Sequence, residues 1–326
     1  MSPTMSKQKV LVTRKLPGSA IKKLQAQYAV TLNNKSSNLK KSELKKMVVG
    51  QDAILCLLAD KIDKEIIDAA GKQLKVIANY AVGCDNIDIA TARAKGIIVT
   101  NTPGVLTQAV AEHAMALLIT IARRIPESDK FLRQNKYKGW EPELFLGNEL
   151  CGKTLGIVGM GRIGGAVAKI AAKGYNMKVV YFDNGKSNPE LDKTISSSNV
   201  NLTELLKTSD FVSIHVPLLP STRHLIGKKE LGLMKKTAYL VNTARGPVID
   251  EKALVNALKN KKIAGAALDV FEFEPKLSPG MSSLTNIVIT PHIASATIET
   301  RTAMAELAVN NIIAVLSGQP AITKVE

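Results

Sequence analysis

The 326-residue chain has few cysteines, few aromatic residues and no long apolar run. Cys56, Cys84 and Cys151 lie far apart and follow no CxxC spacing, so the sequence offers neither a disulfide framework nor a cysteine-rich metal site. The longest apolar run, around residues 114–122, is about half of the roughly 20 residues that a membrane helix needs. The N-terminus lacks the apolar core of a signal peptide. These absences predict a cytoplasmic protein with no membrane partner and no bound metal.

Acidic residues are also scarce, because 28 Asp and Glu stand against 44 Lys and Arg and leave a formal charge of +16. Such a charge raises the possibility of nucleic-acid binding. In the first hundred residues, however, the lysines take the polar face of amphipathic segments such as "KSELKKM", and only Tyr28 and Tyr80 could stack on bases there. We therefore interpret the lysines as a solvated surface and expect no nucleic-acid partner. A positive field can also steer small anionic substrates toward a cleft.

Short β-type runs alternate with helical ones in two parts of the chain. The first hundred residues contain "VLVT", "AILCLL", "LKVIANY" and "IIVTN", and the rhythm resumes at Leu155 with "LGIVG", "VVYF", "FVSIHV", "AYLVN", "GAALDVF" and "IVIT". This alternation predicts an α/β fold with two parallel sheets covered by helices. Residues 107–134 between them read as one long helix with a kink before Pro126. Its first half is apolar nearly all round, so we expect it to be buried, with another subunit as a candidate partner.

A glycine-rich segment follows the strand that begins at Leu155. Gly159, Gly161 and Gly164 form the pattern G-x-G-x-x-G, and a second strand ends in Asp183 about 20 residues downstream. Pyrophosphate can approach the backbone of such a turn at the start of a helix, while the Asp183 carboxylate can accept hydrogen bonds from ribose hydroxyls and repel a 2′-phosphate. The segment predicts NAD, with NADH preferred over NADPH, although Lys186 could soften that preference. A glycine turn that binds nothing is the competing interpretation.

Charged side chains follow three further predicted strands. Arg245 lies in "LVNTARGPVID", Asp269, Glu272 and Glu274 lie in "ALDVFEFEP", and His292 lies in "TPHIAS". In an open parallel sheet, ligands bind beyond the carboxyl ends of the strands, so these side chains should share one edge with the glycine loop. An arginine can grip a carboxylate in a bidentate fork, and a histidine can donate and recover a proton near neutral pH. A carboxylate at the other ring nitrogen would orient the imidazole and favour its protonated form.

These segments, together with "NYAVGCDNIDI" and "VTNTPGVLTQAVAEHAMALL", resemble the D-isomer-specific 2-hydroxyacid dehydrogenase family over essentially the whole chain. The resemblance implies that Arg245 binds substrate and that His292 is the catalytic acid and base. It also implies that Glu274, rather than Glu272, pairs with this histidine. The backbone of Val82 and Gly83 matches the part of the family motif that holds the substrate carboxylate.

The family's chain order implies two doubly wound parallel-sheet domains, with a Rossmann nucleotide domain inserted into a flavodoxin-like substrate domain. Residues 1–101 plus 291–326 would form the substrate-binding domain, and residues 102–290 the NAD-binding domain. Hinges near Asn101 and Pro291 would let a cleft close and exclude water. The long helix after "NTPG" resembles the family's dimerisation element, so a homodimer is expected.

Several further residues are given roles by their positions. The remaining expected cofactor contacts are Arg162, Ile163, Val216, Pro217, Thr222, Thr243, Ala244 and Asp269. Asp269 could instead cap a turn. Five residues have a structural alternative: His113 (packing or interface), His215 (NAD contact or structural), His224 (loop surface), Trp140 (a neighbouring active site or packing) and Ser295 (substrate contact or, as we prefer, a cap of the last helix).

The segment "NTPGVLT" is most similar to the glyoxylate and hydroxypyruvate reductase branch. The resemblance therefore implies reduction of a small 2-oxo acid, with glyoxylate or hydroxypyruvate first and D-lactate or D-3-phosphoglycerate dehydrogenase activity as alternatives. Because the sequence closes at Glu326, we expect it to lack the extra regulatory domain of many phosphoglycerate dehydrogenases. Two other classes remain: an NAD-sensing corepressor of the same fold, and a structural protein that binds NAD without consuming it.

Overall fold

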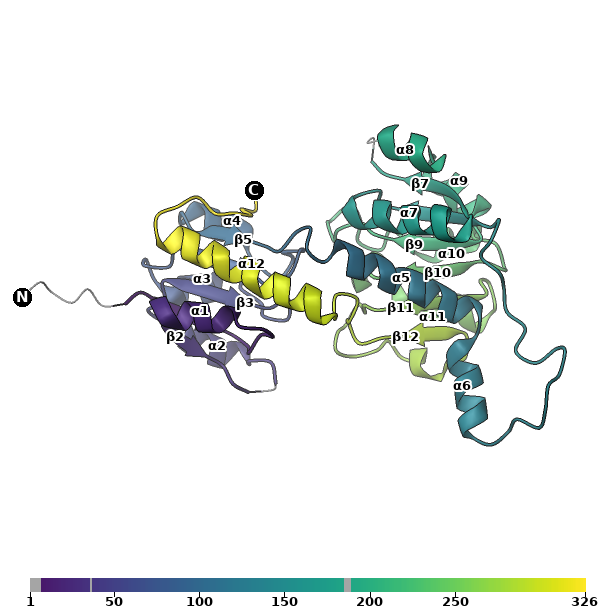
Figure 1. Cartoon of the computed structure of the whole chain (residues 1–326), viewed down its shortest axis with the longest axis horizontal. Coiled ribbons are helices and arrows are strands. Elements are labelled where there is room, and N and C mark those ends of the chain that lie inside the picture. Colours follow the sequence, from purple (N-terminus) through teal and green to yellow (C-terminus); the bar gives the residue numbers. More distant parts are fainter. Residues whose placement is uncertain (1–6, 36, 185–188) are drawn as a thin grey trace, which may run out of the picture. The chain divides into compact units, whose positions relative to one another are not determined.

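The computed structural model describes residues 7–35, 37–184 and 189–326, so Lys186 lies outside the described residues. The chain divides into two units, one running up to Leu106 and resuming at Ala296–Glu326, the other comprising Thr107–Ser295 (Figure 1). Each unit is an open parallel sheet with helices on both faces, which confirms the predicted fold class. Within the described ranges, no helix is both long and apolar enough to cross a membrane.

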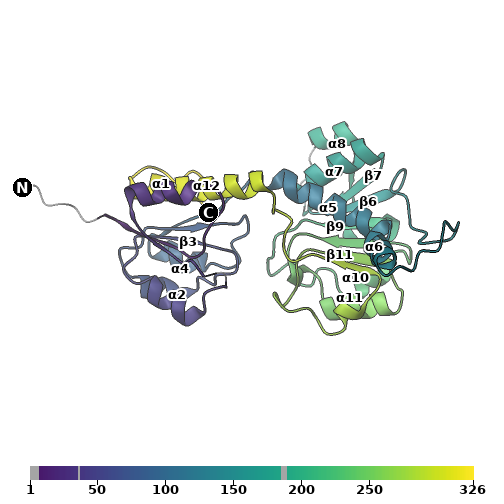
Figure 2. The same ribbon diagram turned by 60° about the horizontal axis from the view of Figure 1, so that its bottom comes forward.

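The first unit has a five-stranded sheet in the order β2-β1-β3-β4-β5, which is the flavodoxin-like order. Figure 2 shows α1 and α12 on one face of this sheet and α2 on the other. The side chains of its central strands β3 and β4 are fully buried, as expected for a parallel sheet covered on both faces. The elements of this unit are β1 (Lys9–Val12), α1 (Ala20–Gln27), β2 (Ala29–Leu32), α2 (Lys41–Met47), β3 (Ala53–Cys56), α3 (Lys64–Ala70), β4 (Val76–Asn79), α4 (Ile89–Ala94), β5 (Ile98–Thr100) and α12 (Ile298–Leu316).

The second unit has a seven-stranded sheet in the order β12-β11-β10-β9-β6-β7-β8. The strand order reverses between β6 and β9, and ligands of open α/β sheets bind beside such a reversal. Helices α5 and α7 pack together on one face, and α9, α10 and α11 on the other. The elements are α5 (Thr107–Ala122), α6 (Ile125–Arg133), β6 (Thr154–Val158), α7 (Arg162–Tyr175), β7 (Lys178–Phe182), α8 (Pro189–Ile195), β8 (Ser198–Asn199), α9 (Leu202–Thr208), β9 (Phe211–Ile214), α10 (Lys228–Leu233), β10 (Tyr239–Asn242), α11 (Glu251–Lys259), β11 (Gly265–Leu268) and β12 (Ile287–Ile289), with short 3-10 turns at Gly246–Val248 and Met281–Ser283.

The long helix expected over residues 107–134 is two helices, because the chain breaks at Arg124. This residue has a φ of 54°, in the left-handed region, and α6 then begins at Ile125 with Pro126 in its first turn, where the missing N–H of proline costs nothing. The apolar side chains of α5, including Leu117 and Leu118, are buried in the core of their own unit against α7, β10 and β11. The apolar pattern of α5 is therefore explained within its own unit.

The observed division of the chain lies a few residues later than the expected borders at 101/102 and 290/291. The Thr102 backbone N–H donates to the Ala81 carbonyl oxygen (2.9 Å), which ties the segment after β5 to the first unit. At the other border, the backbone N–H groups of Ile293 and Ala294 each donate to the Asp269 carboxylate (2.8 Å), which ties this segment to the second unit.

Candidate active site

The expected site residues of the second unit lie beyond the carboxyl ends of its parallel strands, in the loops that leave them and, for Arg162, Ile163 and Gly164, in the first turn of α7. This arrangement follows from the topology, because the ends of parallel strands meet at one edge of the sheet. The glycine loop follows β6, Asp183 follows β7, Val216 and Pro217 follow β9, Thr243, Ala244 and Arg245 follow β10, Asp269 to Glu274 follow β11, and His292 follows β12. Val82 and Gly83 belong to the first unit, where they follow β4.

Two of the three motif glycines are required by close packing within the unit. Gly159 has a φ of 97°, and a Cβ there would lie 2.9 Å from the carbonyl carbon of His215. A Cβ at Gly164 would collide with the carbonyl oxygen of Gly159, so this glycine lets α7 approach β6. Packing inside the protein therefore explains Gly159 and Gly164.

Gly161 has a different environment, because a Cβ there would meet no atom within 4 Å. The residue is the N-cap of the 14-residue helix α7, whose first N–H groups and dipole favour an anion. Next to it, the Met160 backbone N–H donates to the Asp183 Oδ2 (2.7 Å), which fixes this carboxylate beside the glycine loop. The open space at Gly161 and the placed carboxylate fit the pyrophosphate and ribose of a dinucleotide.

The other residues expected at the cofactor fall into two groups. The Thr243 hydroxyl is buried and has no hydrogen-bond partner among the described residues, so a bound group could take that role. Thr222 is different, since its hydroxyl donates to the Pro217 carbonyl oxygen (2.6 Å) and accepts from the Leu219 N–H (2.8 Å). Thr222 therefore holds the loop after β9 in shape. Arg162 is exposed, and Ile163, Val216 and Ala244 are half-buried along the same edge.

Gly161→Ala is expected to raise the KM for the dinucleotide about tenfold or more, because the added methyl group occupies the space that the pyrophosphate would use. The fold should persist, since the methyl group meets no protein atom and alanine at an N-cap costs at most about 1 kcal/mol relative to glycine. Gly174→Ala, in the exposed part of the same helix, is the matched control and should leave KM unchanged. Steady-state kinetics with chemical unfolding of both variants checks this; equal KM values would contradict a pyrophosphate at Gly161.

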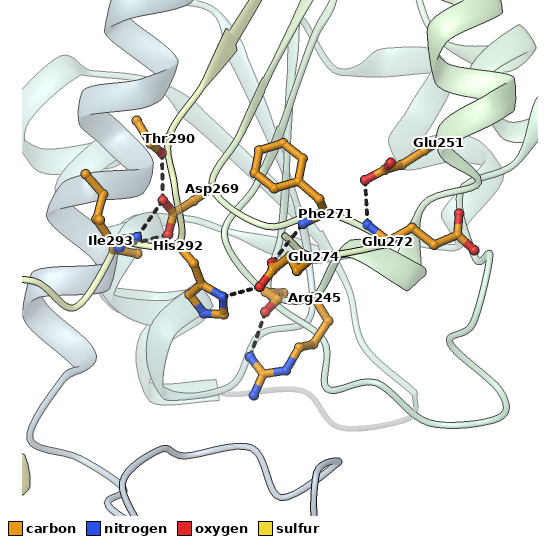
Figure 3. A network of polar contacts seen from close by, with 11 residues as sticks. Arg245, Glu251, Asp269, Phe271, Glu272, Glu274, Thr290, His292 and Ile293 are labelled. Atoms are coloured by element: carbon orange, nitrogen blue, oxygen red, sulfur yellow. Dashed lines mark hydrogen bonds and ion pairs between the residues drawn. The ribbon is translucent and has the colours of Figure 1, made fainter. Parts of the chain in front are cut away.

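The imidazole of His292 pairs with the carboxylate of Glu274 (Figure 3). His292 Nδ1 lies 3.0 Å from Glu274 Oε2, and both side chains are partly exposed. Glu274 Oε1 accepts a hydrogen bond from the Phe271 backbone N–H (2.9 Å), so both carboxylate oxygens are engaged. Burial alone would raise the pKa of Glu274, but the hydrogen bond and charge of His292, the Phe271 N–H and the charge of Arg245 together hold it below its ordinary value. The carboxylate is therefore ionised near neutral pH.

Arg245 follows β10 on the same edge, and Figure 3 shows it near Glu274 and His292. Its guanidinium Nη1 donates to the Ala244 carbonyl oxygen (2.8 Å). The Asn242 side chain fixes this turn, because its Nδ2 donates to the Arg245 carbonyl oxygen (2.9 Å) and its Oδ1 accepts from the Ala244 N–H (3.0 Å). A cation, an imidazole and a carboxylate are thus held together on three adjacent loops.

Asp269 organises the loop that carries His292. The carboxylate is fully buried and accepts hydrogen bonds from the Thr290 hydroxyl (2.6 Å) and the N–H groups of Ile293 and Ala294. His292 itself has a φ of 53°, and its N–H donates to the Asp269 carbonyl oxygen (2.9 Å). Burial would raise the pKa of Asp269, yet its hydrogen bonds, with that of His113 the largest, lower it. These contacts give Asp269 a structural role in this loop, and its expected contact with the cofactor stays a prediction.

The roles of two residues in this network were not predicted from the sequence. His113 on α5 places Nε2 3.2 Å from the Thr290 Oγ1 and 3.4 Å from the Asp269 Oδ1, although its helical pattern indicated packing. Glu251 in the first turn of α11 is buried and accepts from the Glu272 N–H (2.6 Å) and the Ser278 hydroxyl (2.5 Å). Burial raises the pKa of Glu251. A glutamate in a first helical turn is common, so no local signal identified it.

The residues with alternative roles are resolved in part. Ser213 Oγ lies 2.8 Å from His215 Nε2, and burial lowers the pKa of His215 to about 3, so this ring is neutral at physiological pH. His224, whose side chain is 40% exposed, pairs through Nε2 with Glu272 Oε1 (2.7 Å), and the Glu272 side chain is only 7% exposed. The expectation that Ser295 caps the last helix is wrong, because the Thr297 hydroxyl accepts from the Thr300 N–H and is the N-cap of α12. Trp140 is 82% exposed.

The chain is similar in sequence and in structure to known dehydrogenases and reductases. Residues 115–294 match the family described as "D-isomer specific 2-hydroxyacid dehydrogenase, NAD binding domain". A glyoxylate reductase of Thermococcus litoralis is 50% identical over 317 residues, which cover 96% of this chain and 95% of that protein. A crystal structure from Thermus thermophilus has a TM-score of 0.90 and 46% identity, covering 98% of this chain and all of that one. An NADPH-dependent glyoxylate/hydroxypyruvate reductase of Sinorhizobium meliloti, in complex with NADP and malonate, has a TM-score of 0.85 and 31% identity, covering 98% of this chain and 97% of that one.

Proposed function

Because the chain belongs to the D-isomer specific 2-hydroxyacid dehydrogenase family, and is therefore an oxidoreductase that acts on CH–OH groups, we propose that it reduces glyoxylate and hydroxypyruvate with NADH. The observation that carries this proposal is the contact of 3.0 Å between His292 Nδ1 and Glu274 Oε2, with Arg245 on the neighbouring loop. A proton donor, its counter-charge and an anion-binding group are the parts that reduction of a 2-oxo acid requires.

In the proposed reaction each side chain has one task. Arg245 binds the substrate carboxylate and the adjacent carbonyl oxygen through its guanidinium, which is planar and always charged. His292 donates the proton from Nε2 to the carbonyl oxygen as this atom gains negative charge, while Glu274 at Nδ1 stabilises the imidazolium and fixes the ring. The Val82 and Gly83 backbone binds the substrate carboxylate. NADH, when bound, supplies the hydride that reduces the carbonyl carbon.

Asp183 supports NADH as the preferred cofactor. Its carboxylate is held at the end of β7 by the Met160 N–H, where it can bind the two ribose hydroxyls and would repel a 2′-phosphate. The related reductase of Sinorhizobium meliloti is NADPH-dependent, so membership of the family does not by itself decide between the two cofactors. The ratio of kcat/KM for NADH to that for NADPH tests this part of the proposal, and a ratio of one or less would contradict it.

A substrate panel tests the function itself. Oxidation of NADH should be measured with glyoxylate, hydroxypyruvate, pyruvate, 2-oxo-4-methylpentanoate and phosphohydroxypyruvate. We expect the first two to give the highest kcat/KM. A higher value for pyruvate or phosphohydroxypyruvate would contradict the substrate assignment but not the reaction class. Binding of NADH without turnover of any member would contradict the enzyme and favour an NAD-sensing binding protein.

Glu274→Gln is expected to lower kcat/KM for glyoxylate about tenfold at neutral pH, because the amide cannot balance the charge of the protonated imidazole. Since reduction needs that protonated form, the alkaline limb of the pH–rate profile should move to lower pH. Glu272→Gln is the matched control, because this carboxylate lies two residues away and pairs with His224 instead. If the two variants have the same pH profile, the counter-charge role of Glu274 is wrong.

The native protein should also lose stability in acid: its free energy of unfolding should fall at pH values below the lowered pKa of Glu274. The ionised carboxylate contributes stability at pH values above its unfolded pKa, and this contribution is lost as the pH falls through the folded value. Glu274→Gln should therefore lower the free energy of unfolding in the neutral range, and the difference from the native protein should disappear as the pH falls through the folded pKa of Glu274.

The homodimer implied by the family resemblance is also part of the proposal. Large apolar side chains of α6 and the segment after it are exposed in the single chain, namely Leu132 (60%), Trp140 (82%) and Leu146 (65%). Contact with a second copy would remove such surface from water. Sedimentation equilibrium of the protein checks this, and a monomer mass would contradict it.

A further inference from the structure

Three successive carbonyl groups in the loop after β4 are each bound by a neighbouring segment of the first unit. The Ala81 oxygen accepts from the Thr102 backbone N–H (2.9 Å). The Val82 oxygen accepts from Asn101 Nδ2 (2.8 Å), and the Gly83 oxygen accepts from Asn79 Nδ2 (2.8 Å). The orientation of this backbone is therefore set group by group.

The bound carbonyls determine where the N–H groups of the loop point. In a planar trans peptide, the N–H is antiparallel to the carbonyl of the preceding residue. The carbonyls of Ala81 and Val82 both face the neighbouring residues Asn101 and Thr102, so the N–H groups of Val82 and Gly83 both face away from that segment. Neither N–H donates a hydrogen bond to any described residue, and both residues are half-buried. Two successive N–H groups that point to the same side can together bind an anion.

Asn79 is itself held rigidly. Its side chain is fully buried and exchanges two hydrogen bonds with Asn86, Nδ2 to Oδ1 at 3.1 Å and Oδ1 from Nδ2 at 3.2 Å. Asn86 Nδ2 also lies 3.1 Å from the carbonyl oxygens of Leu57 and Asp60, beyond the end of β3. A buried polar group whose partners are all present keeps one orientation, because every alternative leaves a group unpaired. The amide of Asn79 therefore connects the loop to the sheet.

We propose that Asn79, together with Asn101, is a positioning residue that presents the N–H groups of Val82 and Gly83 to the substrate carboxylate and thereby selects 2-oxo acids over 2-oxo aldehydes. This inference rests on the proposed function and adds the residues responsible for acid selectivity. Asn79 does not touch the substrate. It acts through the Gly83 peptide, and Asn101 acts through the Val82 peptide.

Asn79→Asp tests the proposal, because a carboxylate of the same shape cannot donate a hydrogen bond to the Gly83 oxygen and repels it. The KM for glyoxylate should rise about 10- to 100-fold, the effect of losing a hydrogen bond to a charged group. The preference for glyoxylate over glyoxal, in which an aldehyde replaces the carboxylate, should fall by a similar factor. The dissociation constant of NADH, measured by its fluorescence, should not change.

Asn33→Asp is the matched control, since Asn33 is another buried asparagine of the same unit, and its Nδ2 donates to the Thr13 carbonyl oxygen (2.9 Å). It should leave the KM and the glyoxylate-to-glyoxal ratio unchanged. A folded Asn79→Asp protein with a KM within twofold of the native value would overturn the proposal. If that variant does not fold, Asn101→Ala, at a half-buried position, should show the same loss of acid preference, and an unchanged ratio there overturns the proposal equally.

Failure of the proposed function would be distinguishable from failure of this inference. If the native protein reduced no 2-oxo acid, calorimetric binding of oxalate to the NADH-loaded protein would still test the loop. Weaker binding of oxalate to Asn79→Asp than to the native protein supports the inference. Equal binding, or no binding to the native protein, overturns it.

Discussion

His292→Asn is expected to lower kcat/KM for glyoxylate about 10²- to 10⁴-fold, which is the usual contribution of a positioned general acid. The His292 imidazole contacts Glu274 through Nδ1. Without the imidazole, the carbonyl oxygen of the substrate has no proton donor when this oxygen gains negative charge. Asparagine is the informative replacement because residue 292 has a φ of 53°, and asparagine accepts the left-handed region better than most residues. The loss of activity should therefore be large in kcat, while the free energy of unfolding should change only by the small contribution of the partly exposed His292–Glu274 pair.

The control for His292→Asn is His224→Asn. His224 also has a left-handed φ, 52°, and also contacts a glutamate of the segment after β11, since its Nε2 lies 2.7 Å from Glu272 Oε1. We expect turnover of this variant within about twofold of the native rate, as for a surface substitution away from the reacting groups. Near-native turnover by His292→Asn, or an equal loss in both variants, would show that His292 is not the acid.

Arg245→Ala should reduce kcat/KM for glyoxylate about 10²- to 10⁴-fold, mainly through a higher KM. A bidentate contact with a carboxylate comprises two charge-assisted hydrogen bonds of about 1.5–3 kcal/mol each, and both would be lost. The removal of a positive charge near Glu274 should weaken binding of an anionic inhibitor such as oxalate by a similar factor. Binding of NADH should be nearly unchanged, because the glycine loop is intact.

Arg223→Ala controls for the loss of one positive charge at this edge. Arg223 is exposed, and its Nη2 lies 3.4 Å from Glu272 Oε1. The Glu272 side chain is only 7% exposed, but the Arg223 side chain is 56% exposed and its contact is long, so the pair should contribute little and kcat/KM should stay within about twofold. If Arg223→Ala and Arg245→Ala weaken oxalate binding equally, the effect is the general field of a basic protein and not a specific contact by Arg245.

The sequence predicted those features that depend on periodic patterns or on residue types in a defined context. The alternation of strands and helices predicted two parallel sheets, and the glycines after Leu155 predicted a nucleotide loop because a strand precedes them and a helix follows. Polar residues directly after predicted strands pointed to one edge of the sheet. All of these depend on local order, which topology then brings together.

Contacts made by irregular segments could not be predicted from the sequence in the same way. Glu272 and Glu274 both follow β11, and only the path of the chain turns one toward His224 and the other toward His292. His113 lies in an apolar helical pattern, yet its ring contacts the carboxylate of Asp269, which follows a strand far along the chain. The break at Arg124 and the cap at Thr297 depend on backbone angles that residue type biases but does not determine.

The position of α12 at the end of the chain has a consequence for folding during synthesis on the ribosome. The helix packs against β3, β4 and α1, but its residues are the last large element to be synthesised. At about 5 to 20 residues per second, the interval between Thr100 and Leu316 lasts roughly 10 to 40 seconds. During this interval the second unit can fold completely, while the part of the first sheet that α12 will cover, beside α1, stays exposed. Nascent chains stalled before α12 should therefore recruit chaperones to that part of the sheet and release them once the helix emerges.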